Sequence, residues 1–178
     1  MLFGDGPEGP DLLFTERAHQ MRSHPGQVSF PGGSIDPGES PEQAALRETL
    51  EETGVAPNAV RVFGRLPDLW LPPSNFSVTT ILGYSAEEHT WVRNTDEVHA
   101  IWRTPIENLI NPTNRIRVRH PSGWLGPGFL IGEEQEVVLW GFTAGIVARL
   151  FDFLGWSKPW DEAQVRDLPT HMLPPEHR

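Results

Sequence analysis

The chain has 178 residues, 38% of them hydrophobic and 10% aromatic, a composition that fits one globular domain with a full core and excludes global disorder. Its formal net charge of −10 argues against a general nucleic-acid binder, so the binding of an anion would depend on local positive charge. Because the chain has no cysteine, a disulfide framework, a thiolate nucleophile and a zinc–thiolate site are excluded.

The sequence contains neither a charged leader followed by an apolar stretch nor an apolar span long enough to cross a membrane. We therefore predict a cytoplasmic protein without a membrane partner, in which residues 1–178 form a single domain. The first three residues, Met-Leu-Phe, are typical of the end of a strand. An incomplete N-terminal strand is therefore expected, and residues upstream of Met1, or a signal removed there, are left open.

The pattern along the chain predicts several strands and two long helices. Strands are expected at 12–15, 60–66, 77–84 and 98–103, and as a hairpin at 115–120 and 124–131. The other segments are a turn-rich loop at 4–10, a loop at 67–75, a helical turn at 106–109, a helix at 136–155 and an extended tail from about 158. Together with a helix near 41–53, this order predicts an α/β fold with a mixed β-sheet between helices.

The start and stop signals of the first helix are local. Ser40 is a capping residue, Pro41 suits the first turn, and Gln43 can complete a capping box. Gly54 suits the left-handed position just after the helix end. These residues predict a helix over 41–53.

Glu48, Glu51 and Glu52 are expected on one side of this helix, at spacings of three and four residues. The predicted packing face lies opposite and consists of Leu46, Thr49, Leu50 and Thr53. Like charges at this spacing cost about 0.2–0.5 kcal/mol per pair, and the helix dipole disfavours anions near the C-terminus. A hard divalent cation such as Mg²⁺ would offset this cost. The alternative is a solvated acidic face.

Residues 33–55, GSIDPGESPEQAALRETLEETGV, resemble the Nudix box, the signature of hydrolases that split a diphosphate linked to another moiety. All charged and glycine positions of the box are present, and Thr49 stands where the family prefers an aliphatic residue. The resemblance implies an α/β/α sandwich and a Mg²⁺ or Mn²⁺ cofactor. It implies that Glu48 and Glu52 ligate the metal and that Glu51 binds a further metal or a water. It also implies that Arg47 positions the carboxylates and that the Gly33 backbone carbonyl completes the inner shell.

The segment before the box is LFTERA at 13–18, then Arg22, Gly26 and FPGG at 30–33. It is similar to the upstream motif of the coenzyme A diphosphatase branch, although Phe14 replaces a leucine. Arg17 and Arg22 are the expected substrate-binding residues, since guanidinium groups bind phosphates bidentately. The alternative is that both make surface ion pairs. The segments 74–79 and 140–144 extend the resemblance to about residues 12–155.

The resemblance implies hydrolysis of coenzyme A or its thioesters to 3′,5′-ADP and 4′-phosphopantetheine or its acyl form. One alternative is another substrate, such as ADP-ribose, a dinucleotide or a deoxynucleotide. Another is a catalytically silent module that binds a nucleotide, against which the intact set of Arg47 and three glutamates argues. The expected partner is a small nucleotide, and a homodimer is left open.

The sequence leaves two questions about charged residues. A general base outside the box cannot be chosen among Glu87, Glu88, Glu97, Glu133 and Glu134. Arg115, Arg117 and Arg119 alternate with apolar residues, so a strand would place all three on one face. That face is expected to be solvated or to protect an edge strand, and an extension of the anion site is the alternative.

Overall fold

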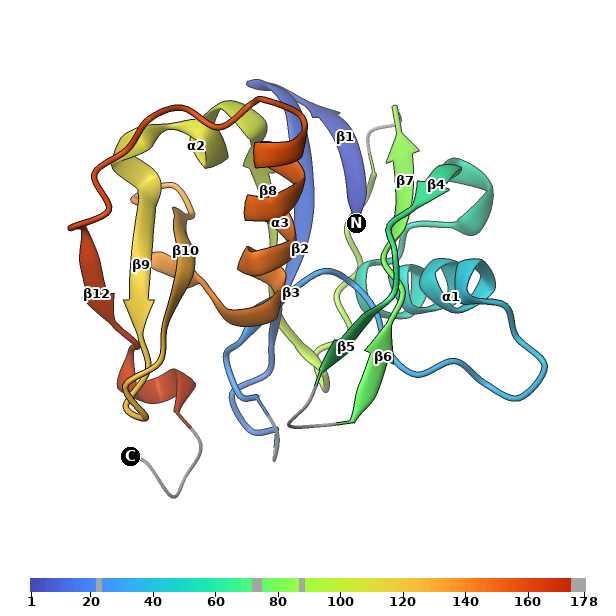
Figure 1. Cartoon of the computed structure of the whole chain (residues 1–178). Coiled ribbons are helices and arrows are strands. Elements are labelled where there is room, and N and C mark those ends of the chain that lie inside the picture. Colours follow the sequence, from blue (N-terminus) through green and yellow to red (C-terminus); the bar gives the residue numbers. More distant parts are fainter. Residues whose placement is uncertain (22–23, 72–74, 87–88, 174–178) are drawn as a thin grey trace.

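The computed structural model describes residues 1–21, 24–71, 75–86 and 89–173 (Figure 1). Its strands are β1 (Leu2–Gly6), β2 (Gly9–Arg17), β3 (Val28–Ser29), β4 (Arg61–Arg65), β5 (Leu69–Leu71), β6 (Phe76–Val78), β7 (Ile81–Ser85), β8 (Val98–Pro105), β9 (Arg115–Arg119), β10 (Leu125–Ile131), β11 (Val137–Leu139) and β12 (Val165–Asp167). Its α-helices are α1 (Pro41–Thr53), α2 (Ile106–Ile110) and α3 (Gly141–Phe153). Short 3-10 helices span Pro57–Ala59, Pro112–Asn114 and Thr170–Met172.

The first sheet is mixed, and β2 lies at its centre. β1 pairs antiparallel with β2 and parallel with β7, and β4 lies at the edge beyond β7. β8 pairs antiparallel along one side of β2, from Asp11 to Arg17, while β1 and β3 pair in succession along the other side. β2 is therefore paired along both of its edges.

Successive side chains of β2 point to opposite faces of this sheet. Leu12 and Phe14 belong to a buried cluster with Val147 and Phe151 of α3, whereas Leu13 belongs to a separate cluster beyond the end of α1. Figure 1 shows α3 beside β2 and α1 beside β4 and β7. The predicted α/β/α sandwich with a mixed sheet between helices is confirmed.

A second sheet, in the order β11-β10-β9-β12, packs on the far side of α3. Phe129 and Ile131 of β10 join the cluster around α3. Leu130, between them, points the other way and packs with Leu168 and Met172. α3 thus lies between the two sheets, as Figure 1 shows.

Three predicted segments are wrong in detail. The loop at 4–10 is mostly the β1–β2 hairpin, because Gly6 pairs directly with Gly9. The loop at 67–75 contains β5, which pairs with β6. The strand at 77–84 is broken between β6 and β7, where the Thr79 hydroxyl donates to Asp68 Oδ1 at 2.7 Å and the Thr80 carbonyl accepts from Leu66 N at 2.9 Å.

The helix predicted over 136–155 begins only at Gly141. Residues 137–139, expected in the first turn of the helix, instead form β11. These contiguous apolar residues pair with β10. Gly141 has a φ of 68° and separates the two elements. Within α3, Ala144, Ile146, Val147 and Phe151 are buried. The tail predicted to be extended adds β12, which pairs parallel with β9.

The expectation for the three arginines of β9 is wrong in part. β9 lies between β10 and β12, so it is not an edge strand. Arg119 is exposed and pairs with Asp167 at 3.3 Å, but Arg115 is buried, with its guanidinium 4.6 Å from the Phe129 ring centroid. Burial lowers the pKa of Arg115. These arginines belong to the second sheet, and α3 and the first sheet separate them from α1, so they do not extend an anion site there.

Candidate functional site

The box helix α1 begins and ends where its local signals predict. Ser40 Oγ accepts from Gln43 N at 3.2 Å, and Gln43 Oε1 accepts from Ser40 N at 2.8 Å, which is the reciprocal capping box. Gly54 adopts a φ of 78°, and its N–H donates to the Leu50 carbonyl at 2.9 Å. These caps fix the register of the helix and thereby the positions of its glutamates.

Glu52 lies on the side of α1 that packs against the sheet. The predicted packing face did not include this residue. Glu52 is only 5% exposed, whereas Leu50 is 43% exposed. The buried carboxylate has a specific partner on β2, because Thr15 Oγ1 donates to Glu52 Oε2 at 3.0 Å. Thr49 and Thr53 are buried as predicted, and their hydroxyls donate to backbone carbonyls four residues earlier.

Arg47 holds the neighbouring carboxylates together. Its Nε and Nη2 donate to the two oxygens of Glu39 at 3.0 and 2.9 Å, which is a bidentate pair. Nη1 donates to Glu48 Oε1 at 2.9 Å and to Glu51 Oε2 at 3.2 Å. Nη2 also donates to the Ser34 carbonyl at 2.9 Å, so the loop before the helix is tied to the same group. Hydrogen bonds with Glu39 and Glu48 raise the pKa of Arg47, and the Arg47 contact lowers the pKa of Glu39.

Gly33 lies directly against Glu48. A Cβ at this position would clash with the Glu48 carboxyl group, so a larger residue would displace that side chain. Glycine at this position therefore brings backbone beside the Glu48 carboxylate. Oxygen donors of this kind suit a hard divalent cation, so the residues present fit the metal that the box implies.

The Glu52 carboxyl group has a pKa raised to about 7, mainly because burial disfavours the charged form. The Thr15 hydrogen bond lowers the value, and the negative charge of Glu48 raises it. Two further residues act on Glu52 electrostatically, Arg17 lowering its pKa and Glu97 raising it. The structure therefore brings Arg17 and Glu97 to the same site.

Arg17 ends β2 two residues after Thr15, and its Nε is buried without a hydrogen-bond partner among the described residues. A buried donor of this kind requires an explanation, and an anionic ligand would supply one. Arg22, the second expected substrate residue, lies outside the described residues.

Among the acidic residues considered for a general base, Glu97 is the one that the structure connects to Glu52. Its backbone carbonyl accepts from Ala18 N at 2.8 Å, which places it beside the end of β2. Glu133 and Glu134 lie in the connection between β10 and β11 of the second sheet, and Glu87 and Glu88 lie outside the described residues. Sequence reasoning also missed Thr15, although it lies inside the upstream motif.

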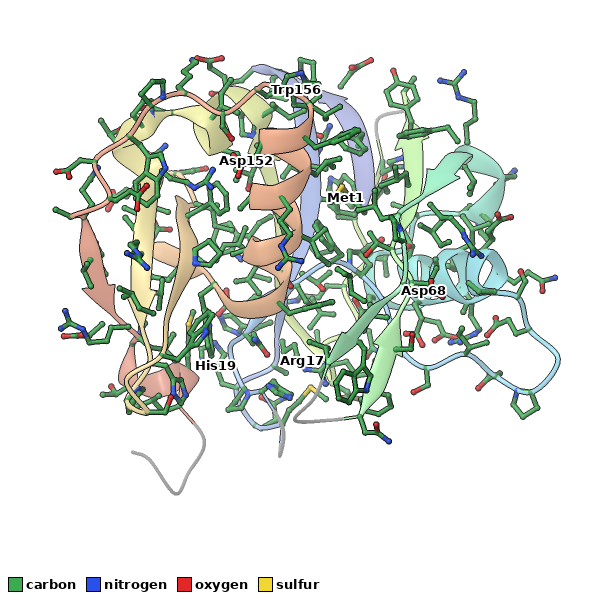
Figure 2. All side chains as sticks on the ribbon, viewed as in Figure 1. Met1, Arg17, His19, Asp68, Asp152 and Trp156 are labelled. Carbon is green, nitrogen blue, oxygen red and sulfur yellow. The ribbon has the colours of Figure 1, made fainter. Side chains whose placement is uncertain are left out.

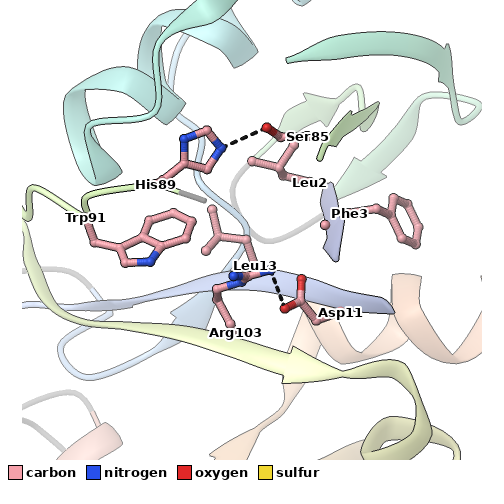
Figure 3. A pocket seen from close by; sticks show the side chains of 9 residues that line it. Leu2, Phe3, Asp11, Leu13, Ser85, His89, Trp91 and Arg103 are labelled. Carbon is pink, nitrogen blue, oxygen red and sulfur yellow. Dashed lines mark hydrogen bonds and ion pairs between the residues drawn. The ribbon is translucent and has the colours of Figure 1, made fainter. Parts of the chain in front are cut away.

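A small pocket at the other end of β2 does not join this site. It has about 10 Å³ of internal space on the face of Leu13, and the close-up in Figure 3 shows Trp91, His89 and Arg103 around it. Arg103 is already paired with Asp11 at 2.7 Å. Asp11 and Arg17 are separated by six residues of extended chain, about 20 Å. This internal space is about what one water molecule needs, so the pocket is too small for a nucleotide.

The comparisons with known proteins agree with this architecture. Residues 2–122 match the family model described as NUDIX domain. The chain is 44% identical over 102 residues to Nudix hydrolase 3 of Caenorhabditis elegans, a match that covers 56% of this chain but only 42% of the relative. It is 35% identical over 148 residues to the uncharacterized Nudix hydrolase NudL of Enterobacter sp. strain 638, covering 80% of this chain and 74% of the relative.

Solved structures support the fold. A Nudix hydrolase from M. smegmatis, RenU, superposes with a TM-score of 0.58 at 19% identity, covering 91% of this chain and 86% of that one. The binary complex of a C. elegans Ap4A hydrolase superposes with a TM-score of 0.52 at 21% identity, covering 61% of this chain and 79% of that one.

The family match covers more than half of the chain, and the Enterobacter relative is aligned over most of its length. The chain therefore belongs to the Nudix hydrolase family, whose members are hydrolases of the diphosphatase type and generally require divalent metal ions. Within the described residues, no helix is both long and apolar enough to span a membrane.

Proposed function

We propose that this protein is a metal-dependent diphosphatase that acts on coenzyme A or its thioesters and gives 3′,5′-ADP and 4′-phosphopantetheine or its acyl form. The observation that carries the proposal is the pair Glu48 and Glu51 on Arg47, together with the buried Glu52, on which Glu48 and Arg17 act electrostatically, and the unpaired guanidinium Nε of Arg17. The substrate choice rests on the upstream motif over 13–33, which resembles the coenzyme A branch.

Each residue has a defined part in this proposal. Glu48, Glu51, Glu52 and the Gly33 carbonyl hold Mg²⁺ or Mn²⁺, and Arg47 keeps the carboxylates in place. A bound divalent cation lowers the pKa of a water ligand and neutralises charge on the diphosphate. Arg17 and Arg22 bind phosphate oxygens of the substrate.

The buried Glu52 supports catalysis over a silent binding module. Burial of a carboxylate is costly unless it is compensated, and the Thr15 hydroxyl supplies one hydrogen bond only. A metal ion supplies the remaining compensation when it binds. A module that binds nucleotides without hydrolysis has no need of this arrangement.

The test is a panel of substrates offered to the purified protein with Mg²⁺ and with Mn²⁺, with the products resolved chromatographically. The panel contains coenzyme A, an acyl-coenzyme A, ADP-ribose, a dinucleotide and a deoxynucleoside triphosphate. The proposal predicts the highest kcat/KM for coenzyme A or its thioester. A higher value for another member assigns the protein to another substrate, and binding without turnover assigns it to the silent class.

Two further expectations are part of the proposal. Residues 1–178 act as one domain, which the shared core of β2 and α3 supports. The cytoplasmic location remains a prediction, and a homodimer is left open.

A further inference from the structure

A second group of metal-ligating side chains lies at the end of β2, away from the Nudix box. One donor atom each from Glu16, His19 and His99 lies within 4.8 Å of the others. His19 Nε2 is 2.9 Å from Glu16 Oε1, and the two imidazole rings meet edge to face with centroids 4.3 Å apart. In Figure 2, His19 lies near Arg17 at the same end of the molecule.

Local irregularity of the sheet brings His99 into this group. Along the β2–β8 pair, Glu16 lies opposite Ala100 and Arg17 lies opposite Val98, so His99 is an extra residue in the ladder. A β-bulge of this kind redirects a side chain and is frequent beside functional sites. The histidine is therefore placed by a specific feature of the backbone, not by the regular alternation of the strand.

The carboxylate in the group is not an ordinary surface acid. Glu16 is 6% exposed, and the Trp102 indole N–H donates to its Oε2 at 3.1 Å. This hydrogen bond fixes the carboxylate so that Oε1 points to His19. Metal-ligating carboxylates have outer-shell donors of this type, which orient the ligand before the metal binds.

We propose that Glu16, His19 and His99 form a binding site for a transition-metal ion of the Zn²⁺ class, separate from the Mg²⁺ or Mn²⁺ site of the Nudix box. Two imidazoles and one carboxylate are donors that suit zinc, nickel or copper, whereas magnesium prefers oxygen donors alone. Two ligands bound to Zn²⁺ at ~2.1 Å lie about 3.3 Å apart in a tetrahedral site. The 2.9 Å between His19 and Glu16 therefore requires only a small adjustment.

The position of this site explains what a bound ion would do. Glu16 and Arg17 are consecutive in β2, so their side chains leave the strand on opposite faces. The Glu16 face carries the two histidines, and the Arg17 face carries Glu52. An ion bound to Glu16 and His99 would link β2 to β8. This link would lie on the face of the sheet opposite Arg17 and Glu52.

Calorimetric titration of Zn²⁺ into metal-stripped protein tests the proposal, with excess Mg²⁺ present to occupy the box. One equivalent of Zn²⁺ is expected to bind and to raise the melting temperature. His19→Gln and His99→Gln should each weaken binding at least about tenfold, and Trp102→Phe should weaken it about tenfold while the stoichiometry stays at one. Two controls, His120→Gln on the β9–β10 hairpin and Glu52→Gln in the box, should bind Zn²⁺ like the wild type.

The imidazole resonances of the wild-type protein give a readout that does not depend on the folding of any variant. Zn²⁺ should shift the signals of His19 and His99 and leave that of His120 in place. The proposal is overturned by the absence of Zn²⁺ binding, by unchanged affinity in both histidine variants, or by loss of binding in Glu52→Gln. In any of those cases the three residues do not form a transition-metal site.

Discussion

At the scale of single residues, Glu52 has surroundings unlike those of a surface glutamate. It is buried on the sheet side of α1, accepts from Thr15, and lies near the charges of Glu48, Arg17 and Glu97. Burial of the charged Glu52 carboxylate therefore lowers the folding stability of the metal-free protein. A locally unfavourable residue of this kind is typical of a functional site, where a bound ligand compensates for it.

The stability of the metal-free protein is expected to depend on pH through Glu52. Its folded pKa of about 7 exceeds the ordinary 4.5, so its stabilising contribution is complete below about pH 4.5 and is lost as the pH rises through about 7. Glu52→Gln removes this titration. The stability of the variant relative to the wild type should therefore increase over this range, by no more than about 3 kcal/mol.

Denaturant unfolding in EDTA at several pH values measures this difference. Glu51→Gln removes an equal charge from a side chain that is 51% exposed, and it controls for the general effect of charge on the helix. A stability difference between Glu52→Gln and wild type that stays constant from pH 4.5 to 7 would contradict the account of Glu52.

Arg17 should determine the preference for coenzyme A over dephospho-coenzyme A. The two substrates differ by a 3′-phosphate, and a hydrogen bond to a charged group contributes about 1.5–3 kcal/mol, or roughly 10- to 150-fold in kcat/KM. If Arg17 binds this phosphate, Arg17→Ala should reduce kcat/KM for coenzyme A by that factor and spare dephospho-coenzyme A. Arg22→Ala is measured in parallel, and Arg119→Ala, on the second sheet, serves as the control.

Equal losses of kcat/KM on both substrates would place Arg17 at the shared diphosphate or in the scaffold. Unchanged kinetics on both would remove Arg17 and Arg22 from the proposed function.

At the scale of elements, α1 is a locally determined helix that presents its glutamates through well-formed caps. Ser40→Ala removes the side-chain acceptor for Gln43 N, so it should lower the free energy of unfolding by about 1 kcal/mol. Ser40→Asp keeps an acceptor and should retain most of the stability. The value of kcat at saturating metal should change little in either variant. Equal stabilities of the alanine and aspartate variants in chemical denaturation would show that the cap does not stabilise α1.

The caps of α1 could be predicted because they depend on neighbouring residues alone. The orientation of the helix could not, since the partner of Glu52 is Thr15, 37 residues earlier in the chain. The same reason explains the helix predicted over 136–155: the apolar residues of β11 fit either element, and pairing with β10 selects the strand. The box residues were identified from their spacing, but the approach of Arg17 and Glu97 to Glu52 depends on how β2 and β8 pack against α1.

At the scale of the whole molecule, the segment after the family match completes the core. The match ends at residue 122, yet Val147 and Phe151 of α3 cover Leu12 and Phe14 of β2. α3 in turn separates the first sheet from the second. The two sheets therefore depend on one helix that the matched segment does not contain.

A chain shortened to residues 1–122 is accordingly expected not to fold. Its loss of α3 and β10 would expose the buried side chains of β2, and burial of each such side chain contributes about 1.5–3 kcal/mol. Circular dichroism on heating should show a cooperative transition for the full chain and none for the shortened one. A cooperative transition in the shortened chain would show that the matched segment is an independent domain and would contradict the single-domain prediction.

The central claim is that the glutamates of α1, Glu52 among them, hold a divalent cation for hydrolysis of the coenzyme A diphosphate. The most direct measurement is the release of 3′,5′-ADP from coenzyme A by wild-type protein and by Glu52→Gln, each with saturating Mg²⁺ and with EDTA. The account predicts turnover by the wild type that EDTA abolishes, and a kcat for Glu52→Gln that is lower by orders of magnitude in a folded variant. Release of 3′,5′-ADP by Glu52→Gln at a rate near that of the wild type, or wild-type turnover that persists in EDTA, would contradict it.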